Sequence, residues 1–407
     1  MRIATLQFAP KLGDVEGNIT RANELLKRGK VIACDGSSER MEVGIDGLRP
    51  DLLVLPELAL TGYNFPSREA IKPFLETAGD GVSFRWACET AKRLHCKVCI
   101  GYPEIENCRE GSASTKYYNS LLVVDESGTV IHNYRKSFLF MTDETWADEG
   151  DVELGTCTLP FSSSNESSKP KMDSSHQNSE EEPACRQVPT SFGICMDINP
   201  YKFEAPYKAY EFANRVRDAG SQLVVLSMAW LTHMSQQEMT NLRGKPDMDT
   251  FSYWLNRFMP LIEKRMRHVG DIDGDSLRTP DETEIKRAVL VFANRAGEEP
   301  SADDTKPAAR YAGTSTVIAV TQRTRKAAAG TTSGLESREK HPAGMIDLEE
   351  TSEDASVIDT KIVCWDLLGA AEEGICFADT TAEPKMVFRL KRREDQGDSD
   401  EESDESE

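Results

Sequence analysis

The 407-residue sequence has no apolar stretch long enough to span a bilayer and no excess of basic residues. It contains 48 lysine and arginine residues against 69 aspartate and glutamate residues, a net charge of −21. Most of this imbalance falls in two acidic runs, 347–359 and 394–407, so the rest of the chain is only mildly acidic. Nucleic-acid partners recognised through a basic face are therefore not expected, and neither is a membrane.

Several motifs of cofactor and metal chemistry are also missing. There is no glycine-rich phosphate loop, no H-E-x-x-H and no internal repeat. Cys96 and Cys99 form a C-x-x-C, but no second pair lies at zinc spacing, and in a strand the two side chains point to opposite faces. We interpret them as core cysteines.

The first residues, Met1–Phe8, have the pattern of a strand and lack the features of a signal or transit peptide. Ten cysteines without a secretory signal favour reduced thiols over a disulfide framework. We therefore expect a cytoplasmic protein, with the nucleus as a further location.

Apolar runs that predict buried strands alternate with amphipathic stretches that predict helices, which favours a layered α/β domain. The expected strands are 3–8, 51–56, 97–102, 190–195, 222–228, 288–293 and 314–320, with a hairpin at 117–134. The expected helices are 18–30, 81–94, 207–219 and 251–269. Residues 1–391 are predicted to form one domain with flexible inserts at about 162–188 and 321–356, followed by a disordered acidic tail, 392–407.

Three reactive side chains each lie at or just beyond the end of a predicted strand: Glu57, Lys136 and Cys195. Each also has an ordinary interpretation, as a helix-terminal carboxylate, a surface ammonium and a core thiol. Sites assemble at the carboxyl ends of strands in α/β sheets, so the three placements together point to a cysteine nucleophile with an acid and a base nearby.

The strings around these residues resemble a known family. Leu55-Pro56-Glu57, Tyr134-Arg135-Lys136 and Gly193-Ile194-Cys195-Met196-Asp197 look like the Glu-Lys-Cys motifs of the nitrilase (carbon–nitrogen hydrolase) superfamily. The resemblance covers nearly all of residues 1–320 apart from the inserts. Longer strings, 56–65, 195–206 and 228–231, are most similar to the fungal protein N-terminal amidase branch.

This resemblance implies a four-layer α-β-β-α sandwich and a mechanism that needs no metal or organic cofactor. Glu57 is the expected base and Cys195 the nucleophile, and Lys136 with the backbone N–H of Met196 would stabilise the oxyanion. The family has a second glutamate beyond its lysine. Glu144 matches it by spacing, although the neighbouring Asp143 leaves the assignment open.

The implied substrates are polypeptides with a free N-terminal Asn or Gln, deamidated to Asp or Glu with release of ammonia, a step that feeds the N-degron pathway. A free α-ammonium needs a carboxylate or carbonyl group nearby, for which Asp197 and Asp143 are candidates, while Trp230 is a candidate to pack against the substrate. Asp197 has an equally good interpretation as the cap of a helix that follows the nucleophile.

Two alternatives remain open from the sequence. One is a small-molecule amidase or nitrilase of the same superfamily, which would need no α-amine. The other is a noncatalytic scaffold that binds a basic partner through its acidic tail, which is disfavoured because all three reactive positions are intact. The sequence does not specify an oligomeric state.

Overall fold

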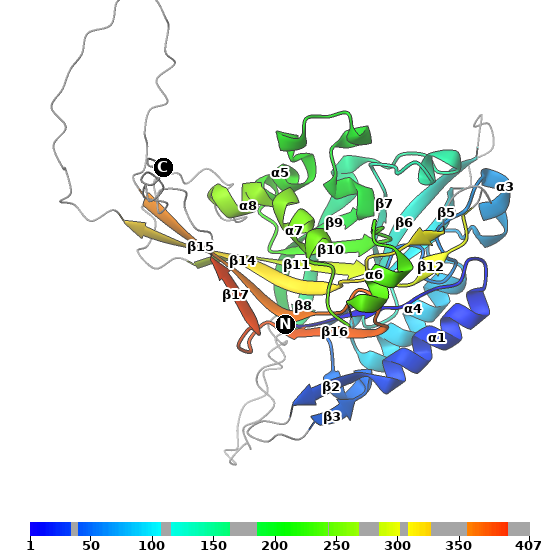
Figure 1. The fold of residues 1–407 in the computed structure, drawn as a ribbon, viewed down its shortest axis with the longest axis horizontal. Helices are drawn as coiled ribbons and strands as arrows, with labels where there is room; N and C mark the ends of the chain where they lie inside the picture. The colour runs from blue at the N-terminus through cyan, green and yellow to red at the C-terminus, as the bar shows by residue number, and fades with distance from the viewer. Residues whose placement is uncertain are drawn as a thin grey trace, which may run out of the picture.

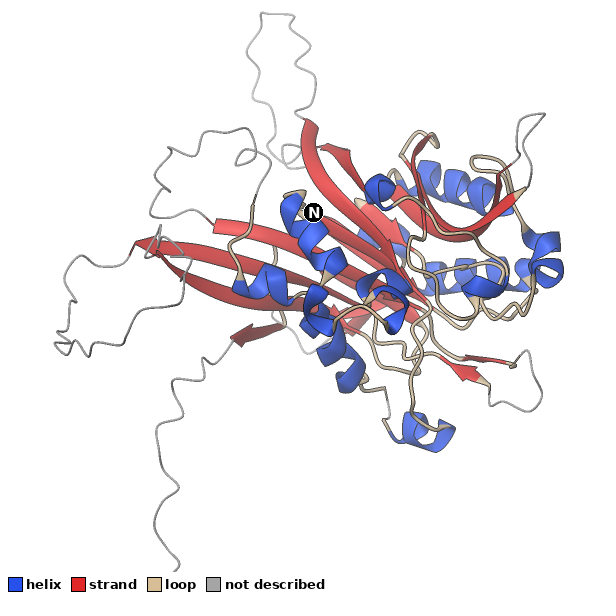
Figure 2. Cartoon of the chain, turned by 90° about the horizontal axis from the view of Figure 1, so that it is seen from above, coloured by secondary structure: helices blue, strands red, loops and turns tan. Residues whose placement is uncertain are grey.

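Two large β-sheets lie face to face, and helices cover the outer face of each (Figures 1 and 2). The computed structural model describes residues 1–33, 40–106, 115–162, 185–242, 244–267, 285–301, 308–326 and 356–389. The expected acidic tail and most of the two expected inserts lie outside these residues. The four-layer α-β-β-α architecture is confirmed.

The first sheet has six strands, with parallel strands β1, β4 and β5 at its centre. A β-hairpin extends it on one side, and β16 pairs antiparallel with β1 on the other. The order is β16 (Gly374–Asp379), β1 (Arg2–Gln7), β4 (Leu52–Val54), β5 (Lys97–Glu106), β6 (Lys116–Val124) and β7 (Val130–Arg135).

The second sheet has seven strands, and β9, β10 and β11 run parallel within it. Its order is β17 (Met386–Arg389), β15 (Ser356–Leu367), β14 (Thr316–Lys326), β11 (Ile285–Asn294), β10 (Leu223–Met228), β9 (Cys185–Ile194) and β8 (Thr156–Ser162). Two short ribbons lie outside the large sheets: β2 (Lys30–Ala33) with β3 (Arg40–Val43), and β12 (Glu298–Glu299) with β13 (Ala309–Arg310).

Successive side chains of the first sheet pack alternately into two different hydrophobic cores. Leu52 and Val54 point toward the second sheet, whereas Leu53 points toward the helices on the outside. Cys99 belongs to the core between the sheets and Cys96 to the core beneath the helices, as the alternation predicts. Both faces of this sheet are covered by apolar side chains. The sequences of its central strands are therefore continuous hydrophobic runs.

The helices form two groups in Figure 1, with α1 and α4 against the six-stranded sheet and α5, α7 and α8 against the seven-stranded sheet. Among the described residues, no helix is both long and apolar enough to cross a membrane. The α-helices are α1 (Val15–Arg28), α2 (Ile45–Leu48), α3 (Arg68–Ile71), α4 (Val82–Leu94), α5 (Glu211–Asp218), α6 (Gln236–Asn241), α7 (Met248–Arg257) and α8 (Met259–Glu263). The 3₁₀ turns are η1 (Lys72–Phe74), η2 (Asp143–Thr145), η3 (Val152–Gly155), η4 (Cys195–Ile198), η5 (Tyr201–Phe203) and η6 (Tyr207–Ala209).

Several predicted elements have other bounds in the structure; for example, β9 begins at Cys185, within the expected insert, and three further differences have a clear physical cause. The helix expected over 251–269 is divided into α7 and α8 at Phe258, because Pro260 lacks the N–H that a continuous helix requires. The helix expected over 207–219 is interrupted by Tyr210, whose φ of 46° is left-handed. Strand β14 continues to Lys326, beyond the predicted strand end at Val320, because β15 pairs with it along that length.

Candidate active site

A buried cluster of one ammonium and two carboxylates lies at the carboxyl ends of the strands. The Lys136 Nζ atom is 2.6 Å from Glu57 Oε1 and 2.6 Å from Asp143 Oδ2. Glu57 follows β4, Lys136 follows β7 directly, and Asp143 begins η2. All three side chains are buried, so each charge depends on the others for the compensation that water would otherwise supply.

Asn119 completes this cluster and was not predicted from the sequence. Its Nδ2 atom donates to Glu57 Oε1 at 2.7 Å and to Asp143 Oδ1 at 3.0 Å, so it separates the two carboxylates. The β6–β7 hairpin pairs Ser120 with Arg135, and the Lys136 N–H donates to the Asn119 carbonyl. Counting residues back from the predicted turn pairs Asn119 with Arg135. A β-bulge between Val123 and Val124 shifts the register by one residue and places Asn119 beside Lys136, so the sequence pattern alone did not mark it as a site residue.

The expected sharp turn at Cys195 is present. Strand β9 ends at Ile194, and Cys195 starts η4 with a φ of 41°, a left-handed backbone conformation that is uncommon for a residue other than glycine. The Cys195 side chain is only 9% exposed and lines a cavity. Burial raises the pKa of its thiol, and so does the Glu57 carboxylate, while Lys136 and the Ala229 N–H act in the opposite direction. The thiol thus interacts electrostatically with both Glu57 and Lys136.

Burial also dominates the electrostatics of the cluster. It raises the pKa of Glu57, and the Asp143 carboxylate adds to that rise, although Lys136 and Asn119 oppose it. The pKa of Lys136 is also raised, because attraction to Asp143, Glu57 and Cys195 outweighs the lowering caused by burial. Lys136 is thus held as a cation, and Glu57 is a stronger base than an exposed glutamate.

The second carboxylate of the cluster belongs to Asp143 rather than to the predicted Glu144. Asp143 accepts hydrogen bonds from Lys136, Asn119 and the Phe140 N–H, whereas Glu144 is exposed and contacts none of these groups. Successive side chains of a 3₁₀ turn point about 120° apart, so only one of two neighbours can face the cluster. Because Asp143 is paired and buried outside the cavity lining, its prediction as a substrate-binding residue does not match its position.

Asp197 likewise lies away from the cavity lining. Its Oδ1 accepts from the N–H groups of Ser137 and Phe138, and its Oδ2 accepts from the Ile194 N–H and the Tyr134 hydroxyl. The side chain is fully buried. Asp197 therefore ties the turn at the nucleophile to the loop just after Lys136, which matches the capping interpretation rather than the binding of an α-ammonium.

Cys195 opens onto a cavity of about 800 Å³. Met196 and Trp230, both predicted from the sequence, also line it. The Trp230 ring packs against Tyr253 and Trp254, with centroid distances of 5.5 and 6.0 Å, so one wall is aromatic.

Three carboxylates that the sequence analysis did not single out line the same cavity: Glu238, Asp247 and Asp249. Asp247 is buried and caps α7 through the N–H groups of Asp249 and Thr250. Asp249 is exposed, and within the described part of the chain its carboxylate forms no ion pair. Among the described lining residues, none is lysine or arginine.

The Glu57 backbone is positioned by a close contact with β5. At Gly101, a Cβ atom would lie 2.8 Å from the Glu57 Cα atom and 2.7 Å from the Leu58 nitrogen. Only glycine permits this approach, and the Gly101 carbonyl accepts from the Ala59 N–H. The position of the predicted base therefore depends on a residue in the neighbouring strand.

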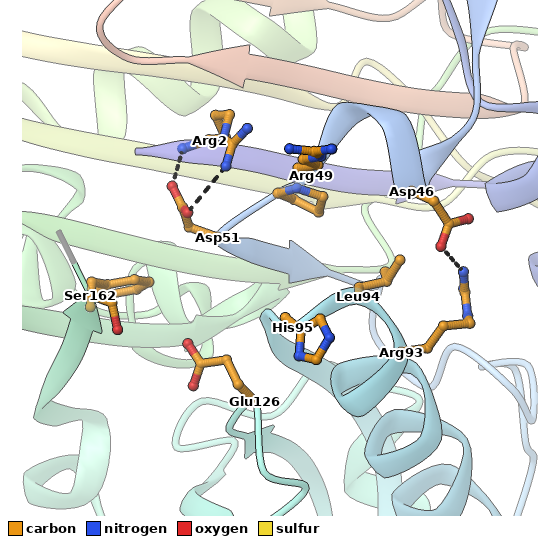
Figure 3. Close-up of a pocket in the computed structure, with 11 residues that line it drawn as sticks. Arg2, Asp46, Arg49, Asp51, Arg93, Leu94, His95, Glu126 and Ser162 are labelled. Carbon is orange, nitrogen blue, oxygen red and sulfur yellow. Dashed lines mark hydrogen bonds and ion pairs between the residues drawn. The ribbon is translucent and has the colours of Figure 1, made fainter. Parts of the chain in front are cut away.

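A second cavity, of about 570 Å³, lies at the opposite ends of the strands (Figure 3). Its charged walls are largely paired: Arg2 contacts Asp51 just before β4, and Arg93 donates to Asp46 at 2.6 Å. It contains none of the predicted site residues. In the parts of the chain that the structure describes, no group of three or more His, Cys, Asp or Glu residues is arranged to hold a metal ion.

Comparisons with known proteins show which family the chain resembles. Residues 2–198 match the carbon–nitrogen hydrolase family model. The chain is 30% identical over 336 residues to the protein N-terminal amidase of Schizosaccharomyces pombe, covering 79% of this chain and 92% of that protein. It is 32% identical over 244 residues to the protein N-terminal amidase of Saccharomyces cerevisiae, covering 60% of this chain and 48% of that protein.

The fold also matches solved structures. It aligns with a crystal structure of an N-terminal amidase with a Gln-Gly peptide at a TM-score of 0.60 and 22% identity, over 96% of this chain and 99% of that chain. A structure with an Asn-Glu-Ala peptide matches equally well, with a TM-score of 0.60. On its sequence identity to the S. pombe relative across nearly all of that protein's length, the chain belongs to the carbon–nitrogen hydrolase family.

Proposed function

We propose that the protein hydrolyses the side-chain amide of N-terminal Asn and Gln in polypeptides, giving Asp or Glu and ammonia. The observation that carries this proposal is the position of Cys195 between an open cavity and the buried Glu57–Lys136–Asp143 cluster. The relatives described above bear the name protein N-terminal amidase, which supports the substrate class.

In the first half-reaction, Glu57 takes the proton of the Cys195 thiol as the sulfur attacks the amide carbon. The raised pKa of the thiol means that it rests neutral, so it needs a base at the moment of attack. Negative charge then develops on the amide oxygen, and Lys136 and the Met196 N–H stabilise it. Glu57 returns its proton to the leaving nitrogen, ammonia departs, and a thioester remains.

In the second half-reaction, water attacks the thioester. Glu57, again ionised, removes a proton from this water as its oxygen attacks the thioester carbon. The C–S bond then breaks, Glu57 returns the proton to the Cys195 sulfur to restore the thiol, and the carboxylic acid product ionises in water. Asp143 takes no proton in this scheme. Its role is to share the Lys136 ammonium with Glu57, and its 2.6 Å contact keeps that ammonium directed into the cluster.

The substrate's α-ammonium is bound by the carboxylates that line the cavity. Asp249 is the best placed of the three, because Asp247 and Glu238 already accept hydrogen bonds within their own helix caps. This assignment replaces Asp197 and Asp143, whose oxygens are occupied elsewhere. Trp230 would pack against the substrate from the aromatic wall.

The test is ammonia release from matched substrates: an Asn-initiated peptide, a Gln-initiated peptide, the N-acetylated Asn peptide and free asparagine. The proposal expects turnover of the first two and loss of turnover on acetylation. Cys195→Ala is the matched inactive control, with circular dichroism to show that it folds. Preferential turnover of free asparagine, or equal turnover of the acetylated peptide, would favour a small-molecule amidase instead.

We place this reaction in the cytoplasm or nucleus, where newly formed N-terminal Asp and Glu feed the N-degron pathway. The free cysteines among the described residues agree with a reducing compartment. Fractionation of cells that express the tagged chain tests this, and recovery in a secreted fraction would contradict it.

A further inference from the structure

The cavity at Cys195 is larger than an N-terminal Asn or Gln residue requires. Its volume of about 800 Å³ lies within the range of about 300–1,000 Å³ found for pockets that enclose a drug-sized ligand. Of the residues assigned to the chemistry, Cys195 and Met196 line this cavity, whereas Glu57, Lys136 and Asp143 are buried and do not. The remaining volume is therefore available to the residues that follow the substrate's N-terminus.

The outer wall of this cavity is formed by apolar side chains from two loops. Phe140 and Met141 come from the loop that follows Lys136, and Phe203 comes from the segment after Cys195. The Phe140 and Phe203 rings meet edge to face, with centroids 6.4 Å apart. Yet Met141 is 67% exposed and Phe203 is 55% exposed, so this wall has apolar surface that nothing in the described chain covers.

The backbone that carries Phe203 is strained. Lys202 and Phe203 have φ values of 53° and 57°, a left-handed pair without glycine. Such a conformation is unfavourable for a residue other than glycine and persists only where its surroundings impose it. Here Phe203 N–H and Glu204 N–H bond back to Pro200 and Tyr201, which fixes the turn. Two unfavourable features, strain and apolar exposure, thus coincide at the cavity mouth.

The lining of the cavity contains three carboxylates and one imidazole, that of His233. Glu238, Asp247 and Asp249 line it, and no lysine or arginine is found among its described lining residues. An acidic side chain that entered this cavity would face these carboxylates and would meet no lysine or arginine among the described lining residues, whereas an apolar side chain would cover Phe203 and Met141.

We propose that the wall of Phe140, Met141 and Phe203 binds the side chain of the substrate's second residue and selects apolar over acidic residues there. This specificity rests on the proposed function, because it needs a peptide held by its first residue at Cys195. The second residue of the substrate does not take part in the reaction, so this selectivity acts only through binding of the peptide.

The experiment compares kcat/KM for four peptides that differ only in residue two: Asn-Leu, Asn-Gly, Asn-Gln and Asn-Glu. Partial burial of a leucine side chain predicts about a tenfold advantage of Leu over Gly. The kcat/KM of the Asn-Glu peptide is expected to be severalfold lower than that of the Asn-Gln peptide. This difference in kcat/KM should become smaller at high salt.

The substitutions Phe203→Ala and Met141→Ala should each bring the ratio of kcat/KM for the Asn-Leu peptide to kcat/KM for the Asn-Gly peptide closer to one. Val387→Ala is the matched control, since Val387 is 52% exposed but lies on β17, at the far edge of the seven-stranded sheet, and should keep the wild-type ratio. Equal kcat/KM for Leu and Gly, with ammonia released from both, would overturn this inference and leave the proposed function standing. Absence of ammonia from all four peptides would overturn both.

Discussion

Asn119 donates a hydrogen bond of 2.7 Å to the Oε1 atom of Glu57, and both side chains are fully buried. The same amide group reaches Asp143 at 3.0 Å, so one neutral residue holds two carboxylates that would otherwise face each other. The Asn119 Oδ1 atom is buried without a partner in the described structure. The cost of that orphaned acceptor indicates that the position of the Nδ2 group is what matters here.

Asn119→Asp should therefore move the acid limb of the pH–rate profile to higher pH. The new carboxylate has nearly the same shape as the amide but adds a third negative charge beside one ammonium, which disfavours ionisation of Glu57. A shift of about one pH unit is expected. It is measured as kcat/KM against pH with an Asn-initiated peptide. Asn23→Asp, on the exposed surface of α1, is the control and should leave the profile unchanged.

The unsubstituted protein should lose activity in acid at a higher pH than an ordinary glutamate would impose. Burial raises the pKa of Glu57 above its usual 4.5, so the carboxylate takes up a proton as the pH falls through that raised pKa, and the base is then lost. Lys136, with its pKa also raised, stays cationic and adds no loss near neutral pH. An acid limb at or below 4.5 in kcat/KM would contradict this assignment.

Lys136→Met should destabilise the fold as well as abolish turnover. It leaves Glu57 and Asp143 buried without their shared cation, and removal of one partner of a buried pair typically costs about 3–5 kcal/mol of unfolding free energy. Urea denaturation measures the loss. Lys92→Met removes an exposed lysine from α4 and should change stability by less than about 0.5 kcal/mol.

Asp197→Asn tests whether this residue is a structural clamp. The side-chain amide of the variant would direct an NH₂ group toward backbone N–H groups, such as those of Ser137 or Ile194, that donate to a carboxylate oxygen in the wild type. The unfolding free energy should therefore fall by about 2–4 kcal/mol. Asp80→Asn breaks only an exposed pair with Arg85 and serves as the control. A variant of wild-type stability with a raised KM would instead restore Asp197 as a substrate ligand.

Asp249→Asn should raise KM for an Asn-initiated peptide about two- to fivefold with little change in kcat, the range expected when one exposed charge pair is lost. Glu16→Gln is the control, because Glu16 is an exposed acid in the first turn of α1, away from the cavity. An unchanged KM would remove Asp249 from the proposed α-ammonium site.

The layered fold could be predicted from the sequence, and so could the position of Glu57, Lys136 and Cys195 at strand ends, because both follow from local patterns. The interpretation of the sequence was wrong about the continuous helix through Phe258, where Pro260 outweighed a good amphipathic pattern. It missed Asn119, because a β-bulge that the sequence does not reveal shifts the hairpin register between Val123 and Val124 and turns Asn119 toward the cluster.

By itself, the sequence determined which segments are buried strands and which reactive side chains follow them, because hydrophobic period and residue order are properties of the chain. Only the tertiary structure decided that Asp143 rather than Glu144 meets Lys136, and that Asp197 braces the nucleophile turn instead of facing the cavity. Neighbouring or closely spaced acids have the same chemistry in a sequence. Their roles diverge only when folding sets the direction of each side chain and gives it partners to neutralise its buried charge.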